Sequence, residues 1–152
     1  MLALDEASRA TLLDAAGDDE VIEALQEHVD PPLECPLDKA WDGIQRCLTD
    51  GTLADDRFPL GAAVLGGLPL HEGDSYIVSY NTADEVREIA VALAALDVAD
   101  VEARFWSLDP DDYDGSIDAE DLEYVLAYLQ DLMAFYQKAA HHGWASVFFA
   151  DQ

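Results

Sequence analysis

The segment from Ile117 to Gly143 carries the longest uninterrupted helical pattern in the sequence, and it constrains the fold more than any other stretch. Apolar residues recur along it at steps of three and four, which places them on one stripe of a helix with 3.6 residues per turn. Three further aromatic residues widen this stripe, so we expect the helix to pack against several neighbours in a globular core. The stripe consists of Leu122, Val125, Leu126, Leu129, Leu132, Met133 and Tyr136, widened by Tyr124, Tyr128 and Phe135.

Both ends of this helix carry residues that favour its start and its end. Asp118 is a suitable N-cap, and the acidic residues of the first turn complement the positive end of the helix dipole. At the other end His141 and His142 precede Gly143, a residue type that commonly follows the last helical turn. The sequence therefore predicts one long helix around which the other elements are arranged.

The rest of the 152-residue chain predicts shorter helices and a few strands. Helical patterns begin near Asp5, Asp18, Pro36, Thr82 and Asp97, each close to a residue that starts helices well. Residues 75–80 and 144–150 have the apolar, β-branched and aromatic character of strands, and residues 2–4 predict a strand stub. This order predicts a single α+β domain, with about six helices around a small mixed β-sheet and the long C-terminal helix at its centre.

Acidic residues dominate the charge of the chain. There are 33 acidic against seven basic residues, which gives a formal net charge of −26. Nucleic-acid phosphates and anionic membrane surfaces both require clustered Lys and Arg, so the charge disfavours direct binding to either. Two interpretations of the acidic bias stay open: a heavily solvated surface, or a surface shaped to meet a basic protein partner.

The sequence contains neither a membrane-spanning run nor a secretory signal. No apolar run approaches the ~20 residues of a spanning helix. The N-terminus lacks a basic start followed by an apolar segment, and two cysteines, Cys35 and Cys47, are too few for a disulfide scaffold. We therefore expect a soluble, cytoplasmic protein with reduced thiols and predict no oligomeric state.

Two central motifs resemble those of a known family. The first lies within residues 37–51, LDKAWDGI followed by Leu48-Thr49 and Gly51, and the second is PLGAAVLGG at residues 59–67. With the later order of strand, helices and closing strand, they are similar to the YfbM-like family of small bacterial proteins of unknown function, over about residues 2 to 149. The resemblance implies the α+β fold of that family. It implies no catalytic residues, because the family supplies none.

The first of these motifs also holds our candidate binding site. Asp38, Lys39, Trp41 and Gln45, joined by Tyr76 from the predicted strand, combine polar and aromatic groups of the kind that line a binding cleft. The binding site is the alternative to a purely structural interpretation, which is the more common role for such residues. In it Asp38 satisfies free N–H groups at a helix start, Lys39 lies over an aromatic ring, and Trp41 anchors the core.

Two sets of residues are candidates for a metal site, and neither has the spacing that such a site needs. Residues 112–123 have the length of a calcium loop, but its sixth and eighth positions, which require glycine and a hydrophobe, hold Ile117 and Ala119. No cysteine or histidine pair has zinc-ligand spacing. We therefore predict no metal and no cofactor. A zinc site would need a tertiary coincidence among Cys35, Cys47, His71, His141 and His142.

Catalytic motifs are missing from the sequence as well. There is no G-x-S-x-G elbow, and the glycines around Gly66 and Gly67 lack the pattern of a phosphate-binding loop. Cys47 beside a distant histidine is a conceivable nucleophile, but a cysteine next to an apolar helix face usually belongs to the core. We therefore favour a non-enzymatic binding or interaction protein with an acidic surface for a basic protein partner. The alternative is a small-ligand-binding protein or enzyme that uses the region from Asp38 to Gln45.

Overall fold

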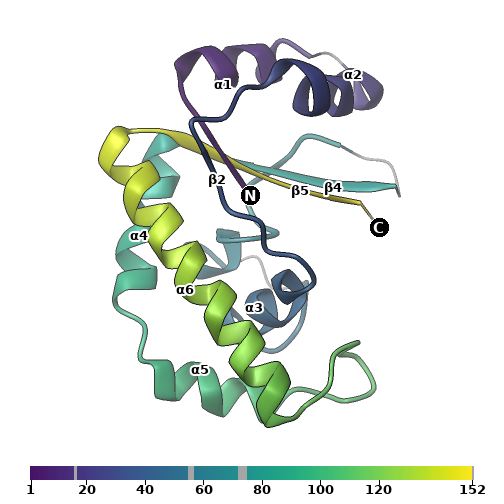
Figure 1. Cartoon of the computed structure of the whole chain (residues 1–152), viewed down its shortest axis with the longest axis vertical. Coiled ribbons are helices and arrows are strands. Elements are labelled where there is room, and N and C mark those ends of the chain that lie inside the picture. The colour runs from purple at the N-terminus through teal and green to yellow at the C-terminus, as the bar shows by residue number, and fades with distance from the viewer. Residues whose placement is uncertain (16, 55–56, 72–74, 152) are drawn as a thin grey trace.

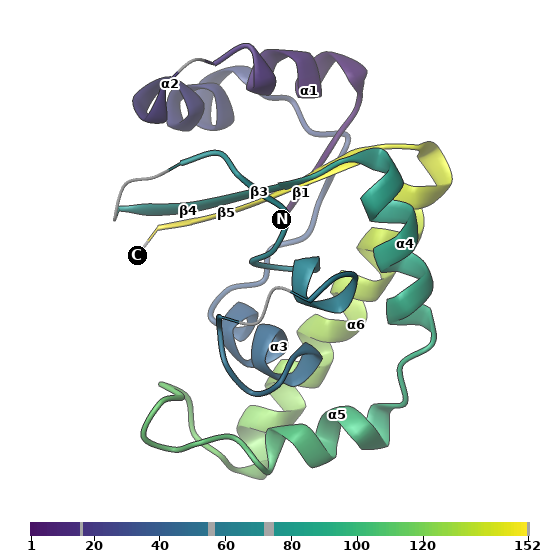
Figure 2. The ribbon, with the colours of Figure 1, turned by 180° about the vertical axis from the view of Figure 1, so that it is seen from behind.

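The protein is built in three layers around a five-stranded sheet (Figure 1). The structure is a computed structural model, and it describes residues 1–15, 17–54, 57–71 and 75–151. One face of the sheet is covered by two short helices, and four helices lie on the other side, as the view from behind also shows (Figure 2). The first layer holds α1 (Glu6–Leu13) and α2 (Asp18–Glu23), and the other holds α3 (Ala40–Leu48), α4 (Ala83–Ala94), α5 (Val98–Phe105) and α6 (Ala119–His142).

The strands of the sheet lie in the order β2-β1-β5-β4-β3, and every pairing between them is antiparallel. Our prediction of a mixed sheet is wrong in this detail, whereas the α+β class and the six α-helices are confirmed. The reason lies in the connection from β4 to β5. Three helices separate these strands, and α6 returns the chain to the end of β4 at which α4 began, so Asn81 pairs with Ser146 and β5 runs back along β4. The strands are β1 (Leu2–Leu4), β2 (Leu33–Glu34), β3 (Leu68–Pro69), β4 (Tyr76–Asn81) and β5 (Ala145–Asp151).

Helix α6 forms where its periodicity predicts it, and both of its ends are capped. The Asp118 carboxylate accepts the backbone N–H groups of Glu120 and Asp121, each at 3.0 Å. Gly143 adopts a left-handed conformation with φ of 70°, which a residue with a side chain rarely adopts. The helix packs against α3 and α4. Its buried face consists of Val125, Leu129, Leu132, Phe135, Tyr136 and Ala139.

Alternation along β5 divides the apolar residues between two cores, one on each face of the sheet. Val147 faces α1 and α2, where it packs with Leu12 and Val21 in the smaller core. Phe148, the next residue, faces the larger core between the sheet and helices α3 to α6. None of the helices in the described part of the chain is long and apolar enough to cross a membrane.

Helix α3 begins later than the predicted start at Pro36. Asp38 has a φ of 45°, and a turn at Asp38 and Lys39 precedes the first helical residue, Ala40. In the middle of α3, Gly43 allows a close approach to α6, because a Cβ at this position would lie only 2.8 Å from Cγ2 of Val125. The beginning of α3 is thereby brought next to the beginning of α6.

Candidate functional site

A cleft of about 420 Å³ lies where the start of α3 meets the start of α6 and the loop before it. A volume of this size suits a small ligand or one long side chain of a partner. The loop closes one side of the cleft through Tyr113, Asp114 and Gly115. Among the described residues, the lining consists of Lys39, Trp41, Asp42, Tyr113, Asp114, Gly115, Asp121 and Tyr124.

Three aromatic side chains form walls of the cleft, and packing behind each of them fixes its ring. Trp41 is half-buried and lies against Phe148 with 5.8 Å between the ring centroids. Tyr124 lies edge-on to Tyr128 at 4.9 Å. Tyr113 is buried above Gly43, where a Cβ would come within 2.9 Å of the Tyr113 hydroxyl. The walls are therefore held in place before any ligand arrives.

Two tyrosine–aspartate hydrogen bonds tie these walls to carboxylates. The Tyr113 hydroxyl donates to Oδ2 of Asp121 at 2.7 Å, and the Tyr124 hydroxyl donates to Oδ2 of Asp38 at 2.8 Å. Burial and the Asp38 carboxylate raise the pKa of Tyr124 to about 12. Burial and the Asp121 carboxylate also raise the pKa of Tyr113. Both phenols stay protonated at neutral pH, so they act as hydrogen-bond donors and not as bases.

The raised pKa of Tyr124 gives a testable pH dependence. We expect the Tyr124 phenol to ionise near pH 12 in the native protein, against about 10 in an unfolded chain. Because the folded pKa is the higher one, its stabilising contribution is fully present below about pH 10 and is lost as the pH rises through 12. A spectrophotometric phenolate titration of the protein minus that of Tyr124→Phe isolates this group. Asp38→Asn should move the difference curve to lower pH, and a difference curve already centred near the unfolded value of about 10 would contradict the assignment.

Arg46, which the sequence analysis missed, holds the loop of the cleft to α3. Its side chain is buried, and Nε donates to Oδ1 of Asp42 at 2.7 Å. Its two Nη atoms donate to the carboxylate and the backbone carbonyl of Asp112, and Nη1 also donates to the carbonyl of Gly51. The spacing of Asp42 and Arg46 is the i,i+4 spacing of a helical ion pair, which is the signal that the sequence offered. The link to Asp112 depends on the tertiary fold.

The structure brings three of the five predicted binding residues to the cleft. Lys39 and Trp41 line it, and Asp38 borders it through its bond to Tyr124. Gln45 is buried instead, where Nε2 donates to the carbonyl of Gly61 and Oε1 accepts the N–H of Leu65, so it supports the glycine-rich turn. Tyr76 stacks on Phe149 at 5.3 Å beside the smaller core, on the opposite face of the sheet.

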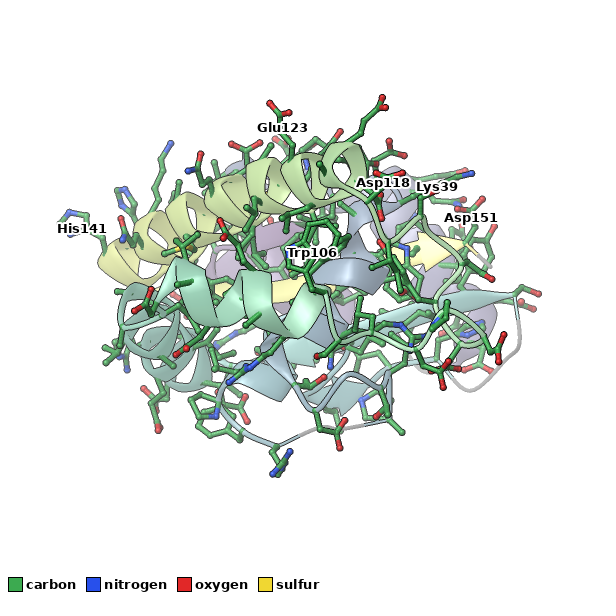
Figure 3. All side chains as sticks on the ribbon, turned by 90° about the horizontal axis from the view of Figure 1, so that it is seen from below. Lys39, Trp106, Asp118, Glu123, His141 and Asp151 are labelled. Carbon is green, nitrogen blue, oxygen red and sulfur yellow. The ribbon has the colours of Figure 1, made fainter. Side chains whose placement is uncertain are left out.

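The predicted metal candidates are also placed by the structure. Within residues 112–123, the candidate calcium loop, Asp112 pairs with Arg46 and Asp118 caps α6. These two carboxylates are therefore directed at the protein itself. His141 lies at the far end of α6 from Asp118 (Figure 3). Within the described ranges, one group of three possible ligands comes together where α2 runs into the π-helical turn Ala24–His28, and it consists of the exposed residues Glu23, Glu27 and His28. This group contains none of the five candidate zinc ligands named in the sequence analysis.

Cys47 does not have the properties of a nucleophile. Its side chain is fully buried, and burial raises the pKa of the thiol to about 12. Because the thiolate is the reactive form, such a thiol is inert at neutral pH. Cys35 is likewise buried, and both cysteines are free. The interpretation of Cys47 as part of the core therefore agrees with its surroundings.

Comparison with known proteins identifies relatives in fold. Residues 2–149 match the model of a family described as "Domain of unknown function (DUF1877)". The crystal structure of YfbM, a protein of unknown function from Escherichia coli, is similar to this structure with a TM-score of 0.72 and 18% sequence identity. The match covers 99% of this chain and 97% of that chain. No curated protein matches the sequence. At this level of identity, the likeness to YfbM shows the fold alone.

Proposed function

From the premise that the chain belongs to the DUF1877 family, as its YfbM-like motifs indicated, we propose that it is a non-enzymatic binding protein whose acidic surface meets a basic protein partner. The observation that carries this proposal is the distribution of charge beside the cleft. Residues 109–123, which we call the acidic segment, contain no Lys or Arg. Their eight acidic residues are Asp109, Asp111, Asp112, Asp114, Asp118, Glu120, Asp121 and Glu123.

Half of these carboxylates are used by the fold, and half are not. Asp109 accepts the N–H of Asp111, and Asp112, Asp118 and Asp121 are engaged as described above. The other four make no hydrogen bond or ion pair through their side chains within the described part of the chain. We call them the outward carboxylates, because they are directed at no group of the fold: Asp111, Asp114, Glu120 and Glu123, of which Asp114 also lines the cleft. Figure 3 shows Glu123 projecting away from α6. Their charge is available to a cationic partner.

An exposed aromatic residue next to this segment also supports a protein partner. Trp106 follows α5, three residues before Asp109, and is 51% exposed. Tryptophan is enriched at the centres of protein interfaces, so Trp106 is a candidate contact for the partner. The free, buried cysteines suit the reducing cytoplasm of a bacterial cell, which we propose as the setting.

Loss of the outward carboxylates should weaken the complex with the partner far more than an equal loss of charge elsewhere. The variant Asp111→Asn, Asp114→Asn, Glu120→Gln, Glu123→Gln removes four charges beside the cleft. The matched control removes four exposed charges from the helices across the sheet, through Asp14→Asn, Asp19→Asn, Glu23→Gln and Glu27→Gln. The partner is first captured from the source cell at low salt, and its association rate is then measured by surface plasmon resonance at rising salt.

We expect the unaltered protein to bind with an association rate that falls steeply from low to physiological salt, because attraction between opposite charges steers the encounter. The variant beside the cleft should lose most of that salt dependence, and the control should keep it. Equal losses in the two variants, or recovery of polycations with no preferred face, would overturn the proposal. The acidic bias would then serve solvation.

The volume of the cleft favours a second candidate, a small-ligand-binding protein. A space of about 420 Å³ lies in the range of small-molecule sites, and Lys39 and Trp41 are among its lining residues, which supports this candidate. This role predicts that native mass spectrometry of protein isolated from its source cell detects a bound small molecule. Trp41→Ala should remove that molecule, and neutralising Glu120 and Glu123 should not.

A further inference from the structure

We propose that the cleft between α3 and α6 receives one arginine side chain of the basic partner. This inference rests on the proposed function and identifies the part of the partner that the site recognises. It is carried by the combination of aromatic walls, carboxylates and a cleft of suitable volume in one place. None of these features alone selects a guanidinium.

The walls of the cleft suit a flat cation. The faces of tryptophan and tyrosine rings carry negative electrostatic potential and attract cations. A guanidinium is planar, stacks on aromatic faces and is more weakly hydrated than an ammonium, so arginine enters such a cleft more readily than lysine. Trp41 and Tyr124 present two rings from different helices, and packing against Phe148 and Tyr128 keeps them in place.

The polar groups of the cleft accept hydrogen bonds more than they donate them. Three carboxylates, those of Asp42, Asp114 and Asp121, line the cleft. Asp42 is bound by Arg46, and Asp121 takes one hydrogen bond from Tyr113 but keeps further acceptor capacity. Asp114 makes no hydrogen bond or ion pair within the described ranges. The Tyr113 hydroxyl donates its hydrogen bond to Asp121, and the Tyr124 hydroxyl donates to Asp38, so neither phenol is left to donate to a ligand. Apart from Lys39, the cleft therefore offers acceptors and calls for a ligand that donates hydrogen bonds. An arginine supplies five donors.

The effect of removing the charge of Lys39 distinguishes a site for a cation from a site for an anion. Lys39 lines the cleft and also a neighbouring hollow on the other side of Trp41. Its side chain is exposed and lines a space that we assign to another cation. Removing this charge should therefore strengthen the binding of arginine, because like charges repel. For an anionic ligand the same change would weaken binding.

The test uses N-acetyl-arginine amide as the probe and its neutral isostere N-acetyl-citrulline amide as the control. The whole protein is titrated with each, and the indole N–H signal of Trp41 is followed by NMR after assignment with Trp41→Phe. We expect saturable shifts with the arginine probe and none with citrulline. Asp114→Asn should weaken binding about tenfold, as the loss of one charged hydrogen bond does. Lys39→Met should strengthen it.

Asp111→Asn is the matched control, because it removes the same charge from the same loop without touching the cleft. It should change the affinity for the probe much less than Asp114→Asn. Equal effects of the two variants, equal binding of citrulline, weaker binding by Lys39→Met, or shifts confined to Trp106 and Trp144 would each overturn the inference.

The outcomes also distinguish this inference from the proposed function. If the arginine probe fills the cleft but no basic partner is recovered, the proposed function fails and the arginine site stands. If a basic partner binds the acidic segment, but Asp114→Asn weakens that complex no more than Asp111→Asn does, the proposed function stands and the arginine site is wrong.

Discussion

Replacement of Arg46 by alanine should lower the free energy of unfolding by about 2–3 kcal/mol, because several acceptors around this buried side chain lose their donor at once. The guanidinium is only 4% exposed and bonds to two carboxylates and two backbone carbonyls. Its removal leaves Asp42 and the carbonyls of Gly51 and Asp112 without their donor. Urea unfolding followed by circular dichroism measures the effect.

Arg87→Ala is the control for this prediction, because Arg87 pairs with Asp84 on the exposed face of α4. We expect that change to cost less than about 1 kcal/mol, as exposed ion pairs do. Arg46→Lys should fall between the two, since lysine keeps the charge but cannot reach all four acceptors. If Arg46→Ala costs no more than Arg87→Ala, then Arg46 does not hold the loop of the cleft to α3.

Truncation of Tyr136 to alanine should cost about 3–5 kcal/mol, as the loss of a large buried aromatic ring does. Tyr136 is completely buried on the inner face of α6, and its hydroxyl donates to the carbonyl of Ala63 at 2.9 Å. Tyr136→Phe separates the two contributions. It keeps the ring and should cost about 1–3 kcal/mol, because the buried carbonyl loses its partner.

Gln137 provides the control on the same helix, since it is the next residue and is exposed. We expect Gln137→Ala to change stability by no more than about 0.5 kcal/mol. The three variants are compared by the midpoints of their urea transitions. A similar loss in Gln137→Ala and Tyr136→Ala would mean that α6 is not the helix around which the larger core is built.

The features that the sequence predicted well depend on local physics. The apolar period of α6 and its end residues Asp118 and Gly143 depend on interactions within a few residues of the chain. They can therefore be recognised from the sequence without knowledge of the fold. The same holds for the capping box of Thr82 and Glu85, which starts α4. The antiparallel direction of β5 relative to β4 could not be predicted from the sequence, because it depends on the path of the three helices between these strands.

The candidate site was predictable only in part, for the same reason. Asp38, Lys39 and Trp41 are neighbours in sequence, and they stay together at the cleft. Gln45 lies on α3 too, but its side chain is directed into the core. Tyr113 and Tyr124 come from the loop before α6 and from α6 itself, so only the packing of α3 on α6 over Gly43 shows that they belong to the site.

The central claim is that a basic protein binds at the acidic segment and the cleft beside it. Its most direct test is an NMR map of backbone amide shifts, recorded while the captured partner is titrated into the labelled protein. We predict that the shifted amides cluster at residues 38–42 and 106–124, with α1 and α2 unaffected. Shifts spread evenly over the acidic surface, or concentrated on α1 and α2, would contradict the account.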